Sequence, residues 1–295
     1  MKTILLAFVL LSSVVFASTK QVDVIYGEDN RKDIYEVKTE LYLNLAKSAA
    51  GQIAKTSINA QGLNSTFSGQ SLISQGICSK EKFSNQVASA RCSGFLVGPD
   101  LLATAGHCVT SDSDCKNYAW VFDYAITSAN QYKVTTPTTS VYNCKKIIKT
   151  VQDSSTMNDF AIVQLDRIVT DRQPLNFEKK DKPIVGTELV VIGCPTGLPL
   201  KISDGAKVRA LNGSYFTANL DTYGGNSGSA VFNAKTGKVE GILVRGEADY
   251  IRDSSGCMVS NRCKDEGCRG EDVTYSNALA DFVNVLLQKG NNGIR

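Results

Sequence analysis

The stretch Leu101-Leu102-Ala103-Thr104-Ala105-Gly106-His107-Cys108 runs from a short apolar segment directly into the only histidine of the chain. Cys92 lies sixteen residues before Cys108. A disulfide between the two would close a loop worth about 3 kcal/mol in the chain-entropy description, and it would fix the backbone beside the imidazole. The stretch therefore indicates a braced, chemically useful histidine, with a packed core histidine as the alternative.

Short apolar or alternating segments follow one another from Cys92 onward, separated by turn residues such as Gly98-Pro99-Asp100 and Asn212-Gly213. This spacing favours barrels or a sandwich over alternating strand and helix units. The expected strands are Ser93–Val97, Tyr118–Phe122, Tyr132–Thr135, Phe160–Leu165, Glu188–Ile192, Lys207–Leu211, Tyr215–Leu220, Ala230–Phe232 and Val239–Val244.

One helix is expected, from Ser276 to about Gln288, because its apolar residues recur at three- and four-residue steps and Gly290 follows it. The stretch Thr56–Ser74 is rich in small polar residues. We expect it to be a surface connection.

The composition is that of an ordinary globular chain, with 295 residues, 42% hydrophobic and 21% charged. It is too apolar for a disordered chain and too mixed for a coiled coil. The length allows one large domain or two smaller ones. A formal charge of +3 requires no strongly basic face, so we expect no nucleic-acid partner.

The N-terminus has the pattern of a secretory signal. Lys2 precedes an apolar run from Ile4 to Phe16, and small residues lead to Ser18. The run is well short of the roughly 20 residues that a membrane span needs, so a signal is favoured over a membrane anchor. We expect removal of residues 1–17, no membrane attachment afterwards, and a protein secreted to the extracellular space or the periplasm.

Export makes disulfides the expected state of the nine cysteines, since oxidising compartments preserve them. Zinc is the alternative for Cys257, Cys263 and Cys268, but the paired C-x-x-C spacing is absent. We expect a disulfide-pinned loop there and neither a cofactor nor a catalytic metal, while a structural calcium stays open. Nine is odd, so at least one thiol is free or paired between chains, and Cys194 is the candidate.

Two further stretches carry chemically capable side chains. Asp159 precedes the apolar run Phe160–Leu165, where the plainer interpretation is a turn residue capping a strand. Ser227 lies in Gly224-Gly225-Asn226-Ser227-Gly228-Ser229, whose glycines allow a tight turn that gathers N–H groups, or simply form a glycine-rich turn. With His107 they stand in the order His, Asp, Ser, which is an order in which three distant residues meet at one site.

These motifs resemble those of the chymotrypsin/trypsin-like serine peptidases: Thr-Ala-Gly-His-Cys at His107, Asn-Asp-Phe-Ala at Asp159 and Gly-Asn-Ser-Gly-Ser at Ser227. The glycine-rich version is similar to the bacterial branch that includes the glutamyl endopeptidases, and Val24–Arg31 resembles the start of the mature chain there. The resemblance extends from there to the terminal helix, loosely over Ile34–Lys82. It implies an all-β fold of two six-stranded antiparallel barrels with a C-terminal helix.

The resemblance also implies roles for individual residues. Ser227 would attack the scissile carbonyl, His107 would take and return the proton, and Asp159 would hold the imidazole. Backbone N–H groups of Gly225 and Ser227 would form the oxyanion hole. The implied activity is that of a secreted serine endopeptidase, acting as a monomer on a protein or peptide substrate.

Three positions depart from the pattern of the resembling families. Asn226 stands where trypsin-like enzymes carry an aspartate that pairs with a newly cut N-terminus, so that switch is expected to be absent, and maturation through the amine near Val24 is a hypothesis. Leu243 stands where glutamyl endopeptidases place a specificity histidine, which disfavours that route to glutamate. Asp221, six residues before Ser227, stands at the floor of the primary pocket, where an aspartate selects Lys or Arg.

An acidic pocket is therefore expected, with Asp221 at its floor, Asp272 on its far wall, and Arg245 and Gly246 also lining it. A buried carboxylate needs a partner, so a Lys or Arg before the scissile bond is the predicted preference. The alternative is that Asp221 is paired internally, for instance with Arg245. We expect the loop Ser255–Glu271 to lie beside this pocket and to narrow substrate choice.

The expected organisation is a signal peptide (1–17), a short pro-segment or N-terminal extension (18–33), a first barrel with His and Asp (34–170), a second barrel with Ser and the pocket (171–275), and a helix with tail (276–295). Two other functions are alternatives. A catalytically inactive homologue would bind proteins through the same cleft, although an intact triad argues against it. An α/β-hydrolase esterase would need Gly-x-Ser-x-Gly and the order Ser, acid, His.

Overall fold

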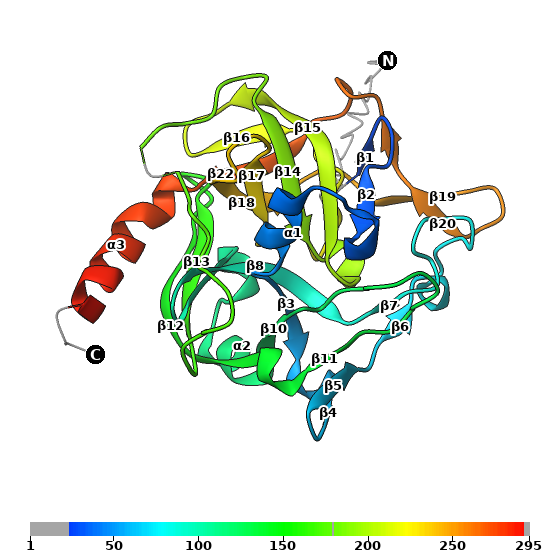
Figure 1. The fold of residues 1–295 in the computed structure, drawn as a ribbon. Coiled ribbons are helices and arrows are strands. Elements are labelled where there is room, and N and C mark those ends of the chain that lie inside the picture. The colour runs from blue at the N-terminus through cyan, green and yellow to red at the C-terminus, as the bar shows by residue number, and fades with distance from the viewer. Residues whose placement is uncertain (1–23, 179, 292–295) are drawn as a thin grey trace, which may run out of the picture.

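The structure is a computed structural model that describes residues 24–178 and 180–291. The expected signal peptide, residues 1–17, lies outside the described residues. Figure 1 shows two β-barrels packed against each other, with helix α3 (Asn277–Asn291) beside them. The fold class expected from the sequence is confirmed, because both barrels are six-stranded and antiparallel and a helix ends the described chain.

The first barrel closes because β3 pairs with both β8 and β10. The order around it is β10, β12, β13, β9, β8 and β3. The bounds are β3 Ala49–Ala54, β8 Ala90–Gly98, β9 Leu101–Thr104, β10 Tyr118–Phe122, β12 Val141–Gln152 and β13 Asp159–Leu165.

The second barrel closes through pairing of β14 with β15, and β2 (Arg31–Asp33) adds to the edge at β15. The order is β14, β17, β18, β22, β16 and β15. The bounds are β14 Glu188–Gly193, β15 Lys201–Leu211, β16 Tyr215–Ala218, β17 Ala230–Asn233, β18 Val239–Arg245 and β22 Glu271–Tyr275.

Strand β14 contributes side chains to the cores of both barrels and so joins them. Leu189 and Val191 belong to the core of the second barrel, whereas Val190 and Ile192 belong to a larger cluster that continues into the first barrel. Because successive side chains of a strand point to opposite faces, a strand buried on both faces must be apolar throughout. The strand Glu188–Gly193 meets this requirement, since every residue after Glu188 is apolar and buried.

The described chain also forms short strands outside the barrels. They pair as β4 with β5, β5 with β11, β6 with β7, β19 with β20, and β1 with β21. Their bounds are β1 Ile25–Tyr26, β4 Ile58–Gln61, β5 Asn64–Phe67, β6 Gln70–Ser71, β7 Val87–Ala88, β11 Thr135–Pro137, β19 Tyr250–Arg252, β20 Met258–Ser260 and β21 Arg262–Cys263.

Two sequence expectations for these strands are wrong. The stretch Thr56–Ser74 is more than a surface connection, because it contains β4, β5 and β6. In β5 the buried positions are Ser65 and Phe67, and a small polar residue at an inward position hides the alternation. The strand expected at Tyr132–Thr135 is displaced: β11 begins only at Thr135. Val134 is the one buried residue of the expected segment, so the segment lacks the alternating burial of a strand.

The predicted C-terminal helix is confirmed and begins one residue later than expected. Leu279 and Val283 are buried in the core cluster, and the ring of Phe282 lies 5.9 Å from that of Phe160 in β13. Within the described chain, no helix has the length and apolarity that crossing a membrane would require. The remaining helical segments are η1 Ile34–Glu36, α1 Glu40–Ala46, η2 Lys55–Ser57, η3 Ile73–Gln75, η4 Gly106–Cys108, α2 Asp112–Asn117, η5 Thr138–Ser140 and η6 Pro195–Gly197.

All nine cysteines lie within the described residues, and eight of them form disulfides. The pairs are Cys78–Cys257, Cys92–Cys108, Cys115–Cys144 and Cys263–Cys268. The bridge predicted between Cys92 and Cys108 is therefore formed, and Cys194 is the free thiol, as predicted. Burial raises the pKa of the Cys194 thiol to about 12, which keeps it protonated and unreactive near neutral pH.

Candidate active site

The pairing of β9 with β13 brings the histidine and the aspartate together. Thr104 at the end of β9 lies opposite Ala161 in β13. In an antiparallel pair, the end of one strand lies beside the start of the other. His107, in η4 just after β9, therefore meets Asp159, the first residue of β13.

The carboxylate of Asp159 holds the imidazole of His107 at two points. Asp159 Oδ2 lies 2.8 Å from His107 Nδ1, and Asp159 Oδ1 accepts the backbone N–H of His107 at 3.1 Å. An ionised carboxylate can only accept, so Nδ1 carries the proton and Nε2 is left as the acceptor. The aspartate is buried while 29% of the histidine side chain is exposed, so the imidazole can reach a substrate.

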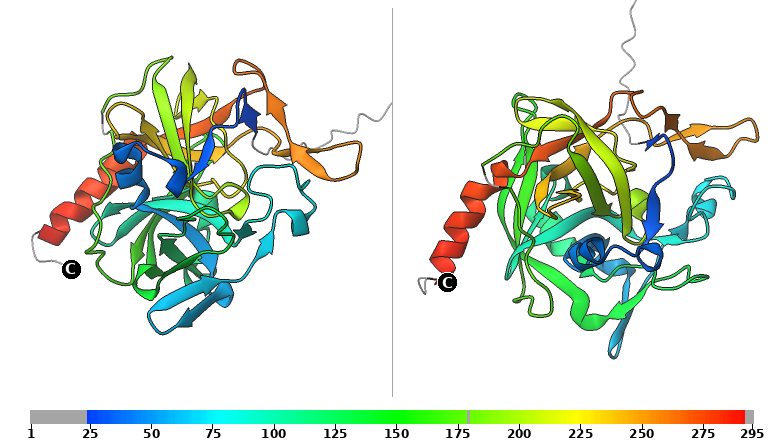
Figure 2. Two further views of the ribbon diagram at one scale, coloured as in Figure 1. Left: turned by 45° about the vertical axis from the view of Figure 1, so that its right-hand side comes forward. Right: turned by 45° about the horizontal axis from the view of Figure 1, so that its top comes forward.

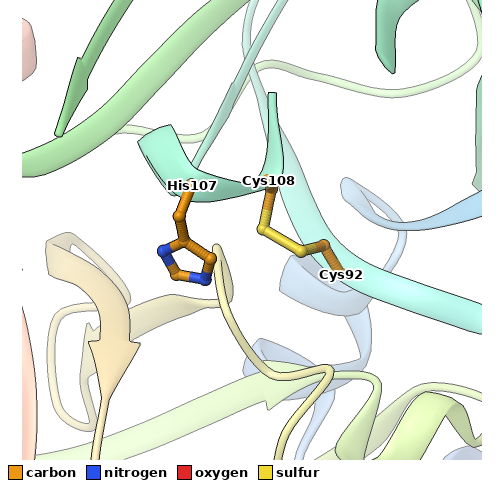
Figure 3. A group of neighbouring side chains, drawn as sticks. All are labelled: Cys92, His107 and Cys108. Atoms are coloured by element: carbon orange, nitrogen blue, oxygen red, sulfur yellow. A yellow bond between two sulfur atoms is a disulfide. The ribbon is translucent and has the colours of Figure 1, made fainter. Parts of the chain in front are cut away.

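Close packing and a disulfide fix the backbone around His107. A Cβ on Gly106 would lie 2.0 Å from the carbonyl oxygen of Val151 in β12, so only glycine fits there. On the other side, Cys108 is bonded to Cys92 of β8, and Figure 3 shows this disulfide beside the imidazole. The histidine is thus held by neighbours on both sides.

Ser227 lies in the turn between β16 and β17, and β8 ties this turn to the histidine. The N–H of Ser93 donates to the carbonyl of Ser227 at 2.8 Å. Ser93 is the neighbour of Cys92, whose disulfide partner Cys108 has its sulfur 3.6 Å from the same carbonyl oxygen. Two adjacent residues of one strand therefore hold the histidine segment and the serine turn next to each other.

The turn itself requires its glycines. Gly225 has φ +95° and Gly228 has φ +88°, a left-handed region that side chains disfavour. A Cβ on Gly225 would lie 2.5 Å from the carbonyl oxygen of Cys194, and one on Gly228 would lie 2.1 Å from that of Ser93. Asn226 is buried and its side-chain oxygen accepts from Ser229 Oγ at 3.2 Å.

The hydroxyl of Ser93 is a further support that no sequence motif indicates. It donates to the carbonyl of Gly225 at 2.8 Å and accepts the N–H of Cys194 at 2.9 Å. Ser93 is buried, so both partners depend on this one group. The hydroxyl joins β8, the turn of Ser227 and the end of β14.

Replacing Ser93 with alanine is expected to lower the free energy of unfolding by about 1–3 kcal/mol, because a buried carbonyl and a buried N–H would lose their partner. Urea unfolding followed by fluorescence measures the loss. The exposed Ser128 provides a matched control, since its replacement by alanine should change stability by less than about 0.5 kcal/mol. Equal effects at the two positions would contradict the support assigned to Ser93.

The carboxylate of Asp221 is engaged by the N-terminal segment. Its two oxygens accept the backbone N–H groups of Tyr26 and Asn30, each at 2.8 Å. The residue is buried, and burial, which penalises the charge, outweighs these hydrogen bonds and raises the pKa of Asp221 to about 7. Of the two alternatives drawn from the sequence, the internal pairing is present, although the partner is not Arg245.

A raised pKa in the folded protein has a defined effect on stability. Between about pH 4 and pH 7 the folded state binds a proton at Asp221 that the unfolded chain has lost, so the free energy of unfolding falls as pH rises through this range. The fall is on the order of 3 kcal/mol. In the variant Asp221→Asn this contribution is absent.

Denaturant unfolding at pH 5 and pH 8 tests this expectation. The native chain should lose more stability between the two pH values than Asp221→Asn does. The exposed Asp166 serves as control, because Asp166→Asn should keep the native pH dependence. Identical pH dependence of the native chain and Asp221→Asn would contradict the raised pKa.

Arg245 pairs with Asp272 instead of Asp221. Its Nε donates to Asp272 Oδ2 at 2.9 Å and its Nη2 to the carbonyl of Met157 at 3.0 Å. Arg269 donates to the same Asp272 oxygen at 2.6 Å. Two guanidinium groups therefore share the carboxylate of Asp272, and the carboxylates of Glu247 and Glu271 lie close to the same cluster.

The remaining predicted pocket residues lie on and after β18. Gly246 follows Arg245 directly and is buried. Leu243 packs inside the second barrel, and its carbonyl accepts the N–H of Gly228. This hydrogen bond connects β18 to the turn that carries Ser227. The loop Ser255–Glu271 carries β20 and β21 and the Cys263–Cys268 bridge.

Among residues 24–178 and 180–291, two groups of side chains have sulfur and oxygen or nitrogen atoms close enough to hold a metal ion. They are Cys92, His107 and Cys108 in one group, and Cys78, Asp253 and Cys257 in the other. In both, the two cysteines are bonded to each other. A disulfide sulfur is no thiolate, so neither group offers the ligands that zinc prefers.

The family and the relative that this chain matches in sequence are both peptidases. The trypsin-like peptidase domain family matches residues 92–242, about half of the chain. A glutamyl endopeptidase of Bacillus licheniformis is 26% identical over 159 residues, which are 50% of this chain and 46% of that protein. The match thus spans about half the length of this relative.

Two solved structures are similar in fold over most of the chain. A Glu endopeptidase in complex with MPD has a TM-score of 0.50 at 16% identity, covering 89% of this chain and 99% of that chain. The Vibrio cholerae VesB protease has a TM-score of 0.54 at 15% identity, covering 90% and 68%. Because the family match covers half of the chain, from Cys92 in β8 to Ile242 in β18, the chain belongs to the trypsin-like peptidase family.

Proposed function

We propose that the protein is a secreted serine endopeptidase that hydrolyses peptide bonds through His107, Asp159 and Ser227. The observation that carries the proposal is that Asp159 holds His107 at two points, while Ser93, next to Cys92 of the adjacent disulfide, binds the carbonyl of Ser227. Secretion is supported by the N-terminal sequence pattern and by four disulfides, which oxidising compartments preserve.

The first half of the reaction forms an acyl-enzyme. Ser227 Oγ bonds to the carbonyl carbon of the substrate while its proton passes to His107 Nε2. The carbonyl oxygen takes the negative charge and is met by the N–H groups of Gly225 and Ser227. Asp159 stabilises the imidazolium that forms. Collapse of the tetrahedral intermediate completes this first half: the C–N bond breaks, the leaving amine takes the proton from His107, and the acyl-enzyme remains.

The second half restores the enzyme. Water then attacks the ester at Ser227 and gives its proton to the same nitrogen. Release of the acid returns the proton to Ser227, so no cofactor enters the balance.

A preference for Lys or Arg before the scissile bond is the first hypothesis for specificity. Asp221 lies six residues before Ser227 and is the acidic group of this segment. Each of its oxygens accepts one backbone N–H, and a carboxylate oxygen has two lone pairs, so an ammonium or guanidinium group could still add to it.

A preference for acidic side chains is the second hypothesis, favoured by one observation. Arg245 and Arg269 share a single carboxylate, and Arg245 also reaches the carbonyl of Met157, two residues before Asp159. A guanidinium has five N–H donors, and the two contacts of Arg245 use its Nε and Nη2, so donors remain for a substrate carboxylate. The relative named a glutamyl endopeptidase agrees with this second preference.

Digestion of a diverse peptide mixture, with cleavage sites identified by mass spectrometry, tests activity and specificity together. We expect cuts that the native chain makes and Ser227→Ala does not. Cuts after Lys or Arg that disappear in Asp221→Asn would support the first hypothesis, and cuts after Glu or Asp that disappear in Arg245→Gln would support the second. No serine-dependent cut from chains beginning at Ser18 or at Val24 would favour the inactive, protein-binding homologue.

A further inference from the structure

One disulfide links the two halves of the chain. Cys78 and Cys257 are 179 residues apart, whereas the other bridges close loops of 5 to 29 residues. Cys78 lies between β6 and β7, in the connection from β3 to β8 of the first barrel, and Cys257 lies in the β19–β20 hairpin. Figures 1 and 2 show these cyan and orange segments side by side. We call residues 76–82 and 249–260 together the inter-barrel clamp.

The clamp is a packed contact as well as a covalent one. The N–H of Cys78 donates to the carbonyl of Met258, and the N–H of Met258 to that of Gly76, both at 2.9 Å. Lys80 forms an ion pair with Asp253 at 3.1 Å. A two-stranded hairpin is marginal on its own in water, so β19–β20 depends on these contacts for its position.

Asp249, directly before the hairpin strand β19, binds Gly224, which lies three residues before Ser227. The carboxylate of Asp249 accepts the N–H of Gly224 at 3.1 Å. The carbonyl of Gly224 accepts the N–H of Thr196 at 2.6 Å, and Thr196 Oγ1 lies 2.7 Å from the hydroxyl of Tyr250. Both sides of this one residue are therefore set by groups that the hairpin supplies or contacts.

The residue before Gly224 is also held by the clamp. The hydroxyl of Tyr223 donates to Ser260 Oγ at 2.7 Å, and Ser260 Oγ donates to Glu81 in the other half of the clamp. The ring of Tyr223 lies 5.0 Å from that of Tyr250. Tyr223 and Ser260 are buried, so this chain of hydrogen bonds is sheltered from water.

These contacts meet immediately before the residue whose N–H is assigned to the oxyanion hole. We propose, on the basis of the function proposed above, that the inter-barrel clamp positions the oxyanion hole, with Asp249 as the positioning residue. Asp249 holds the N–H of the peptide between Tyr223 and Gly224, and it thereby fixes the start of the next peptide, which carries the Gly225 N–H. Gly225 is itself closely packed, because a Cβ there would lie only 2.5 Å from the carbonyl oxygen of Cys194. A shift of Gly224 must therefore rotate or displace the Gly225 N–H.

The expected effect falls on kcat. An oxyanion-hole donor acts mainly on the charge of the transition state, so a misplaced donor lowers kcat and leaves KM nearly unchanged. Misplacement of a reacting group by about 1 Å costs up to about 100-fold in rate. We expect loss of the clamp disulfide or of the Asp249 carboxylate to lower kcat about 10- to 100-fold.

The experiment compares two double variants of the full chain. Cys78→Ser with Cys257→Ser opens the clamp, and Cys115→Ser with Cys144→Ser opens a bridge that joins α2 to β12 in the first barrel. Competent sites are counted by titration with an aryl phosphonate, and kcat and KM are measured per site on one peptide substrate. The first variant should lose kcat at unchanged KM, and the second should keep the native kcat.

Single variants keep the proposal testable if the open clamp does not fold. Asp249→Ala removes the acceptor for the Gly224 N–H, while Asp249→Asn retains a carbonyl oxygen there and should restore most of kcat. Native kcat per site in both the open-clamp variant and Asp249→Ala would overturn the proposal while leaving the endopeptidase intact. A native chain without Ser227-dependent turnover would overturn the proposed function itself.

Discussion

Ser227→Ala is expected to lower kcat by about 10⁶-fold and to leave the fold unchanged. The side chain supplies the only oxygen of the protein that the proposed mechanism bonds to the substrate. The fold does not depend on it, because the contact that anchors this turn to β8 uses the backbone carbonyl of Ser227. The residual rate over water would come from substrate binding and the oxyanion donors.

The measurement is the initial rate on one peptide substrate, together with the midpoint of urea unfolding. Ser128→Ala controls for the change of residue type and should keep the native rate. A rate for Ser227→Ala within about tenfold of native would contradict the nucleophile assignment, because only removal of a non-reacting group has so small an effect.

Asp159→Asn is expected to lower kcat by about 10⁴-fold. An amide in this place can donate a hydrogen bond to His107 Nδ1, which shifts the ring proton to Nε2. Nε2 then has no lone pair to receive the proton of Ser227. The geometry of the pair should survive, since an asparagine has the same shape and its side-chain oxygen could still accept the N–H of His107, as Asp159 Oδ1 does.

The test is to measure the rates of the native chain and of Asp159→Asn from pH 5 to pH 10. Asp159→Asn should be slow across the range where the native chain is active. Asp166→Asn, at an exposed position just after the other end of β13, is the matched control and should retain the native profile. Native activity in Asp159→Asn near neutral pH would show that the aspartate does not set the tautomer.

The sequence predicts the parts of the fold in which strands are apolar. β13, β14 and β18 are long apolar runs and are found close to where the sequence places them. β3 and β12 are absent from the expected strands, because β3 is built of small residues and β12 carries several lysines. Such strands form because their neighbours pair with them, and pairing partners leave no local signal.

In the candidate site, too, some residues are predictable from local sequence and others are not. The residues around His107, Asp159 and Ser227 form recognisable motifs, because the chemistry and the tight turns restrict which residues fit. Ser93 and Asp249 escape notice because their contacts arise only when distant segments meet. The pairing of Arg245 with Asp272 likewise depends on the register between β18 and β22, which places the two residues opposite each other.

Covalent labelling tests the central claim most directly. A fluorophosphonate is applied to chains beginning at Ser18 and at Val24, and the modified residue is located by tandem mass spectrometry. The account predicts one adduct per chain, on Ser227, formed quickly in the native protein and slowly in Asp159→Asn. An adduct on another residue, or none in either chain under conditions that label a known serine peptidase, would contradict it.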